Sequence, residues 1–551
     1  MRSIGRLGTF LLAAAAAAQT PSPTPTFSAA EFRSHVAFLA DDLLEGRDTG
    51  SRGYAIGAAY VAAQFEGLGL TPGGREVDGK RGWYVPIAFR SAKLGSTPAR
   101  VTISGPAGTR SWANGTDVIV GPGAKAEVQD VSAPVVFVGY GIDAPGQGID
   151  DYRGLDVRGK IVALFSDTSP GLPSEIAAHY GDERAAAASR HGAIGMIALP
   201  SEASLKAYSW ARRVATIGGA RMTWLKPDGK PIDEAPNVQA SASLDPASAD
   251  VLFAGAPRPF KAVVAEVARK GVRPKGFALK TSVRIERTSI WTGAESPEVV
   301  GLLPGSDPRL KDEYIVLMGH LDHLGLKPNA RPGEDAIFNG ALDNAAGVAT
   351  MLEVARAFAS TGERPKRSIL FIANAGEEKG LLGADFFAHY PTVPIGKIAG
   401  VVDLDMPLLL YDFTDVIAFG ADHNTVGAAV ARAAGAMGVK LSPDPMPQEG
   451  IFTRSDHYEF VRQGVPAIML ATGYANGGDK QWGAFLRGNY HGVKDDLAQP
   501  IRWEQGARFA RLNYLIARDL ADNPERPHWY QGDFFGDLFA KDQPKVVRAI
   551  R

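Results

Sequence analysis

Four continuous apolar runs in the second half of the chain constrain its fold most strongly. They are YIVLMG at 314–319, SILFIANA at 368–375, IAGVVDLDM at 398–406 and VPAIMLAT at 465–472. Amphipathic segments such as NAAGVATMLEVARAFAS separate them, and this alternation is typical of a mostly parallel sheet with helices on both faces. The pattern therefore predicts an α/β domain over 281–530, built on a mostly parallel mixed sheet sandwiched by helices.

Acidic residues and histidines follow these runs at the points where the strands are expected to end. Because ligands bind at the carboxyl ends of strands in such sheets, we expect these side chains to meet at one edge. They are His320, Asp322 and His323 in GHLDHLG, Glu377 and Glu378 in GEE, Asp403 and Asp405 in VVDLDMP, Asp343 and Asn344 in NGALDNAAG, and Tyr490, His491 and Asp495 in NYHGVKDD.

Each of these residues has an ordinary structural explanation when it is taken alone. Asp343 or Asn344 would cap a helix, and Glu378 would face the dipole of a first helical turn. Their joint placement at one sheet edge favours a functional site, because independent structural residues have no reason to collect there. Imidazole and carboxylate ligands without thiolate suit zinc, although manganese or cobalt would fit the same donors.

These motifs resemble those of the di-zinc aminopeptidases of the bacterial leucyl aminopeptidase and aminopeptidase Y type, which have the zinc-exopeptidase fold. The resemblance covers nearly the whole chain after its first residues, and it includes Met406, which follows Asp405. It implies two Zn²⁺ ions bridged by Asp343. The implied ligands are His320, Asp343 and Asp405 for one ion, and Asp343, Glu378 and His491 for the other.

The same resemblance implies roles for neighbouring residues. Glu377 would act as the general base, and Tyr490 would donate a hydrogen bond to the developing oxyanion. Asp322 would accept a hydrogen bond from the ring of His320 and so fix its orientation. The stretch TRSDHYEF resembles a pocket-lining segment of the family, which implies that Arg454, Asp456 and His457 line the substrate pocket; a capped helix start at Ser455 or Asp456 is the alternative. Asp403 and Pro407 depart from the family pattern and are expected to reshape the specificity pocket.

The implied activity is that of a metallo-aminopeptidase acting on peptides with a free N-terminus. A carboxypeptidase or deacylase of the same fold is disfavoured, because its large insert usually separates the late acid from the last histidine, whereas Asp405 and His491 are 86 positions apart (491 − 405). A dipeptidase, a glutaminyl cyclase and a non-enzymatic relative of the transferrin receptor remain as alternatives. Lys plus Arg is 59 and Asp plus Glu is 60, so the chain has no excess of positive charge that would favour binding of nucleic acid.

The first residues predict an exported protein. Two arginines precede an apolar run that ends in small residues, which is the form of a signal peptide over 1–19. PSPTPT lies in a stiff linker over 20–27. The absence of cysteine excludes a lipoprotein anchor and disulfides, so we expect a periplasmic or extracellular protein without a stable membrane anchor.

The rest of the chain divides into segments of different texture. Residues 28–111 are expected to start with two helices joined by a glycine-containing loop and to fold back onto the peptidase domain. Residues 112–280 are rich in short β runs, with one alanine-rich helix in ERAAAASRHGAIGMIAL, and resemble an inserted protease-associated domain. Residues 531–551 form an aromatic-rich C-terminal tail that is expected to dock on the body. The oligomeric state is open.

Overall fold

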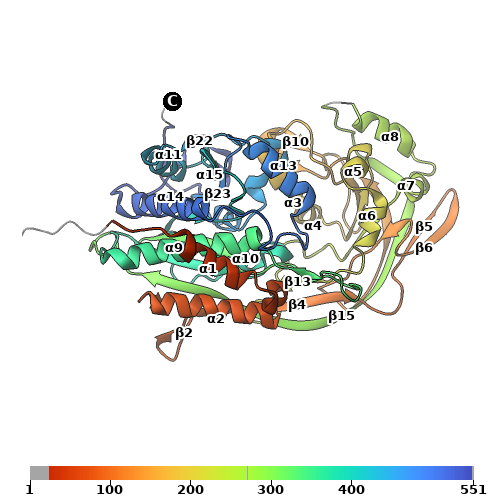
Figure 1. Cartoon of the computed structure of the whole chain (residues 1–551). Coiled ribbons are helices and arrows are strands. Elements are labelled where there is room, and N and C mark those ends of the chain that lie inside the picture. Colours follow the sequence, from red (N-terminus) through yellow and green to blue (C-terminus); the bar gives the residue numbers. More distant parts are fainter. Residues whose placement is uncertain (1–23, 270, 549–551) are drawn as a thin grey trace, which may run out of the picture.

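The computed structural model describes residues 24–269 and 271–548. The expected signal peptide over 1–19 lies outside this part of the chain. Figure 1 shows a helix-covered sheet and a smaller β-rich body, joined by a long curved strand. None of the described helices combines the length and the hydropathy that a bilayer-spanning helix needs.

The four predicted strands form the parallel centre of the main sheet. They are β16 (Tyr314–His320), β19 (Ser368–Asn374), β20 (Ile398–Asp403) and β23 (Ala467–Thr472). β16 pairs in parallel with β19 on one side and with β20 on the other, and β20 pairs in parallel with β23. Successive strands therefore lie on opposite sides of β16, which opens a crevice at their carboxyl ends.

Antiparallel strands flank this parallel centre, so the predicted mostly parallel mixed sheet is confirmed. β15 (Phe277–Leu303) pairs with β19, and β21 (Asp415–Phe419) pairs with β23. β22 (Lys440–Ser442) adds a last, parallel strand beside β21. β21 was not among the predicted strands, although its five residues DVIAF are all buried.

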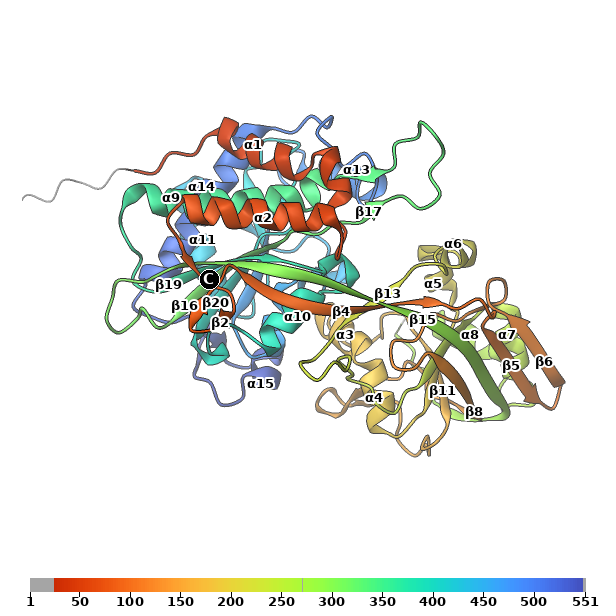
Figure 2. The ribbon, with the colours of Figure 1, turned by 90° about the horizontal axis from the view of Figure 1, so that it is seen from below.

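Helices cover both faces of the sheet, as Figure 2 shows with α2 and α9 on one face and α10 on the other. The two expected N-terminal helices are α1 (Ala29–Leu39) and α2 (Arg52–Gly67), and Ser28 caps α1 by accepting from the backbone of Glu31. α1 packs against α9 (Ala346–Thr361) and α14 (Trp503–Asp522). The other helices of this body are α10 (Leu382–His389), α11 (Val426–Ala436), α12 (His457–Arg462), α13 (Gly478–Gly488) and α15 (Phe534–Phe539).

β15 runs from the β-rich body into the main sheet and ties the two together. Its first half pairs with β5 (Arg100–Gly105) and β8 (Val128–Phe137), and its second half pairs with β4 (Tyr84–Leu94). The β-rich body has its own hydrophobic core around Phe137 and Phe165. Its other main elements are β6 (Gly108–Ala113), β11 (Ile161–Phe165), β12 (Gly195–Leu199), β14 (Ala240–Leu244), α3 (Ser174–Asp182), α4 (Arg184–Arg190), α5 (Glu202–Ala207), α6 (Trp210–Ala215), α7 (Pro246–Leu252) and α8 (Phe260–Val267).

The expectation of a single alanine-rich helix in the β-rich body is wrong for its second half. α4 ends at Arg190, and β12 begins at Gly195 and pairs in parallel with β11. Gly192 has a φ of 82°, a left-handed conformation that favours glycine and ends the helix. The run GMIAL is therefore a strand of the second core.

A partly buried histidine beside the main sheet connects the two bodies. His423, which precedes α11, lies 2.9 Å from Glu175 of α3 and 2.5 Å from Asp533 near the C-terminus. Burial alone would lower the pKa of His423, but the hydrogen bonds to Asp533 and Glu175 raise it to about 9. The protonated imidazole thus joins α3 to the C-terminal segment around α15.

This contact predicts a pH-dependent stability. Since the pKa of His423 is raised from 6.5 to about 9 in the folded protein, its contribution is complete below pH 6.5 and is lost as the pH rises through 9. We expect wild type to unfold at a higher Tm than His423→Gln at pH 6.5, by an effect on the order of 3 kcal/mol at about 1.4 kcal/mol per pKa unit. The Tm difference should shrink toward pH 9; a constant difference would contradict the assignment.

Candidate metal centre

The main sheet and its loops bring the expected site residues to one edge. His320 is the last residue of β16, Glu377 and Glu378 follow β19, and Asp405 follows β20. Asp343 lies in the turn that leads into α9, and His491 follows α13 with a left-handed φ of 53°. All five expected ligands reach this edge, namely His320, Asp343, Glu378, Asp405 and His491.

Two clusters of side chains share Asp343. In the first, His320 Nε2 lies 3.2 Å from Asp343 Oδ1 and 3.3 Å from Asp405 Oδ1. In the second, His491 Nε2 lies 3.3 Å from Asp343 Oδ2 and 3.2 Å from Glu378 Oε2. One oxygen of Asp343 therefore faces each cluster, which is the arrangement of a bridging carboxylate.

The donor atoms of these clusters suit metal ions. Donor atoms of His320, Asp343 and Asp405 all lie within 4.8 Å of one another, and so do those of a group formed by His323, Asp343 and Glu378. Burial raises the pKa of Asp405, and the hydrogen bonds with His320 and His491 overcome burial and lower the pKa of Asp343. A set of imidazole nitrogens and carboxylate oxygens fits zinc.

Asp322 supports the site in a different way from the one expected. Its backbone carbonyl, not its carboxylate, contacts Nδ1 of His320 at 3.1 Å. The carboxylate instead accepts from the backbone N–H of Glu377 at 3.1 Å and of Glu378 at 3.4 Å. It also accepts from the hydroxyl of Thr49 at 2.9 Å. Asp322 therefore orients the turn that carries both glutamates.

The loop after α1 holds two of the ligand-bearing segments together. The buried guanidinium of Arg47 donates to the carbonyl of Leu321 at 2.8 Å, and to those of Asn339 and Gly340 at 2.6 and 3.1 Å. These carbonyls flank His320 and Asp343. The segment FLADDLLEGRDTGSRG thus packs on the body that holds the main sheet, and this role of Arg47 was not predicted.

Asp495 positions the backbone of the shared ligand. Its carboxylate accepts from the N–H groups of Leu342 at 3.0 Å and of Asp343 at 2.9 Å, and from the side chain of Gln499 at 2.7 Å. Burial and the charge of Asp343 raise the pKa of Asp495 to about 6. The motif NYHGVKDD pointed to Asp495 without indicating this structural function.

A cavity lies beside the first cluster, and the stretch TRSDHYEF contributes Ser455 to its wall in addition to the expected Arg454. The hydroxyl of Ser455 lies 2.7 Å from Asp403 Oδ2 and 2.8 Å from Asp405 Oδ2. The expectation that Asp456 and His457 line the pocket is wrong. Both are buried beneath it at 1% and 0% exposure, because they begin α12, and Asp456 accepts a hydrogen bond from Asn374 at 2.7 Å.

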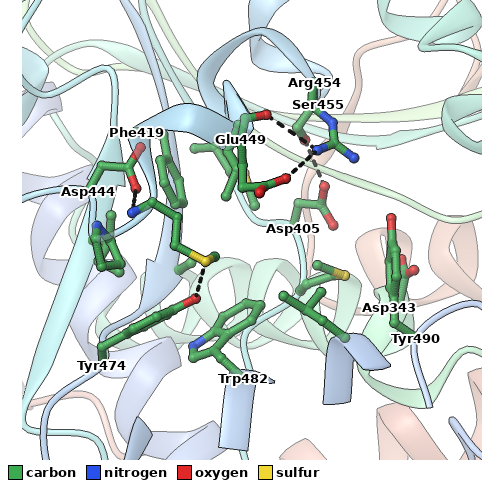
Figure 3. A pocket seen from close by; sticks show the side chains of 18 of the residues that line it. Asp343, Asp405, Phe419, Asp444, Glu449, Arg454, Ser455, Tyr474, Trp482 and Tyr490 are labelled. Carbon is green, nitrogen blue, oxygen red and sulfur yellow. Dashed lines mark hydrogen bonds and ion pairs between the residues drawn. The ribbon is translucent and has the colours of Figure 1, made fainter. Parts of the chain in front are cut away.

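The cavity beside the first cluster has a volume of about 490 Å³ (Figure 3). Glu377, Tyr490 and the cluster residues form its polar end. Asp403 lies outside its lining, whereas Met406 lies on it, in a left-handed conformation with φ 48°. The apolar part of the wall is formed by Met406, Ile417, Phe419, Met446, Ile451, Met469, Ala471, Tyr474, Trp482 and Leu486.

A second cavity, also about 490 Å³, lies on the other side of Glu377. The β-rich body contributes His179, Asp182, Glu183 and Glu234 to its wall. Tyr490 and His491 line both cavities, and their rings stack with centroids 3.8 Å apart. Burial raises the pKa of the Tyr490 hydroxyl well above its ordinary value, so it remains a hydrogen-bond donor.

Comparisons with known proteins agree with this geometry. Residues 298–517 match the profile of peptidase family M28, and this range contains all five expected ligands. A "Probable zinc metalloprotease" of Pyrenophora teres f. teres (strain 0-1) is 42% identical over 109 residues, which cover 20% of this chain and 22% of that protein. One of Phaeosphaeria nodorum (strain SN15) is 39% identical over 118 residues, covering 20% and 23%. The chain therefore matches less than a quarter of the length of these relatives.

The fold is shared with a solved structure over almost its full length. An aminopeptidase from Aneurinibacillus sp. strain AM-1 matches with a TM-score of 0.51 at 18% identity, covering 95% of this chain and 98% of that one. The family match spans the parallel strands, the ligand-bearing turns and most of α14. Over residues 298–517 the chain is therefore similar to peptidase family M28.

Proposed function

We propose that the protein is an exported di-zinc aminopeptidase that hydrolyses the N-terminal peptide bond of its substrates. The observation that carries the proposal is the pair of clusters that share Asp343, with Glu377 open to the cavities on both sides. His320 and Asp405 would complete the first zinc site and Glu378 and His491 the second. Bound zinc ions would act as Lewis acids and lower the pKa of a water molecule.

The residues of the site then have different roles in the reaction. Glu378 is engaged by imidazoles, whereas Glu377 faces the cavities, so Glu377 is the carboxylate that takes the proton from the attacking water. Burial raises the pKa of Glu377 well above its ordinary value, which makes it a stronger base. Glu377 then delivers the proton to the leaving amine. The hydroxyl of Tyr490 donates a hydrogen bond to the oxyanion that develops at the attacked carbonyl.

The cavity supports an apolar N-terminal residue with a free amine. Its wall includes the apolar side chains of Phe419, Met469 and Trp482, which would bury an aliphatic or aromatic side chain. Apart from the proposed ligands and Glu377, the charged residues of the lining are the acids Asp444, Glu449 and Asp479 and the arginines Arg454 and Arg487. The excess of one acid favours an ammonium over a carboxylate. An aminopeptidase is therefore favoured over a carboxypeptidase.

Two further parts of the proposal rest on the sequence. The first residues support export to the periplasm or the medium, by a signal peptide over 1–19. The β-rich segment 112–280 would be a protease-associated domain between the two parts of the peptidase domain, 28–111 and 281–530. Its residues Asp182 and Glu234 line the second cavity, where the peptide beyond the cleaved bond would lie.

The proposed activity is tested with chromogenic anilides of amino acids, unblocked and N-acetylated, with and without a chelator. We expect turnover of unblocked Leu, Met and Phe anilides, none of the acetylated ones, and recovery of the chelated protein by added zinc. Release of C-terminal residues from N-blocked peptides would instead indicate a carboxypeptidase. Zinc-loaded protein that turns over neither substrate class would contradict an enzymatic function and favour a binding protein.

A further inference from the structure

His323 is a buried histidine without an assigned function. It stands in GHLDHLG directly after Asp322, its exposure is 0%, and its backbone N–H donates to the carbonyl of Arg47. Neither ring nitrogen has a hydrogen-bond partner in the described part of the chain. Burying an imidazole in this way is costly unless something else binds it.

The ring of His323 faces a carboxylate of the second cluster. Nδ1 lies 2.6 Å from Oε1 of Glu378, yet the two atoms do not have the geometry of a hydrogen bond, and Oε1 has no other partner. Such converging donor atoms fit a shared cation, because imidazole nitrogen and carboxylate oxygen are both ligands of zinc. Donor atoms of His323, Asp343 and Glu378 indeed lie within 4.8 Å of one another.

The surroundings hold this ring in place. Gly340 approaches it so closely that a Cβ there would lie 2.7 Å from the ring atoms Cγ and Cδ2 of His323. On another side, the ring of His491 meets it edge-on, with centroids 5.9 Å apart. The ring therefore has little freedom to turn away from Glu378 and Asp343.

We propose that His323 is a further ligand of the second metal ion, beside Asp343, Glu378 and His491. The second site then has two imidazoles, whereas the first has His320 alone. Nitrogen ligands suit zinc better than the harder divalent cations, so the second imidazole favours zinc over those cations at the second site. This inference rests on the proposed di-zinc function and adds a residue to it.

The matched control is His457. It is also completely buried, its ring nitrogens also have no hydrogen-bond partner in the described chain, and it lies 3.5 Å from the carboxylate of Asp403. It belongs to neither group of converging donor atoms among the described residues. Replacing either histidine by glutamine removes a buried imidazole, but only His323→Gln removes a ligand.

The test is zinc titration of the full-length protein in competition with a chromophoric chelator. We expect two zinc ions for wild type and for His457→Gln. For His323→Gln we expect one Kd to rise more than about 100-fold, beyond the 10–100-fold cost of losing a residue that merely orients a ligand. A smaller rise would overturn the assignment of His323 as a ligand. Wild type that binds no zinc would overturn the proposed function as well.

A second measurement needs no variant that has to fold. Wild-type protein with nitrogen-labelled histidines is loaded with an NMR-active cadmium isotope, and scalar coupling between cadmium and imidazole nitrogens is recorded. We expect three coupled histidines, namely His320, His323 and His491. Two coupled histidines would overturn the proposal while leaving the two-metal centre intact.

Discussion

Glu377→Gln is expected to lower kcat by about 10²–10⁴-fold while both zinc ions stay bound. The amide keeps the shape of the side chain and its place at the cavities but cannot accept the proton of the attacking water. The backbone N–H of Glu377 still donates to Asp322, so the turn that holds Glu378 is retained. The measurement is steady-state turnover of a leucine anilide together with the zinc content of the variant.

The matched control for this variant is Glu298→Gln. Glu298 is a fully buried carboxyl of β15, and neither of its oxygens has a hydrogen-bond partner in the described chain. Burial raises its pKa well above the ordinary value, as it does for Glu377. Since Glu298 lines neither cavity, we expect unchanged kcat and KM. A similar loss of kcat in both variants would show that Glu377→Gln does not act by removing the general base.

The central sheet was predictable because its strands are buried on both faces. Every residue of β19, β20 and β23 is buried, and such strands appear in sequence as continuous apolar runs. The position of the ligands followed, since the ends of parallel strands share one edge. The helix expected over the alanine-rich run was wrong in its second half, because Gly192 in its left-handed conformation ends the helix before β12 begins.

The supporting contacts could not be predicted, because they join residues distant in sequence. Arg47 donates to carbonyls 274 to 293 positions away, and no local pattern indicates such a partner. Asp456 and His457 show the opposite error: their charged and polar side chains suggested a pocket, but the start of α12 turns them into the core. Ser455 lines the cavity instead, with its hydroxyl at Asp405.

Asp343→Asn is expected to raise the Kd of at least one zinc ion more than about 100-fold and to abolish most of the activity. Each oxygen of Asp343 faces a different histidine, Oδ1 toward His320 and Oδ2 toward His491. An asparagine offers one carbonyl oxygen and one N–H₂ group, which donates hydrogen bonds and does not bind a cation. The variant can therefore serve one cluster at most, and it also removes a negative charge that both metals share.

Asp403→Asn separates this effect from the loss of any buried carboxylate. Asp403 is equally buried and accepts from Ser455, but it contacts neither His320 nor His491. We expect Asp403→Asn to bind two zinc ions with nearly wild-type affinity. Zinc binding also stabilises the fold, by about 4 kcal/mol at 1,000 times the Kd, so Asp343→Asn should lose most of the zinc-dependent rise in Tm that Asp403→Asn keeps. Two tightly bound zinc ions in Asp343→Asn would show that the clusters bind independently, because a shared ligand cannot be halved without cost to one of its metals.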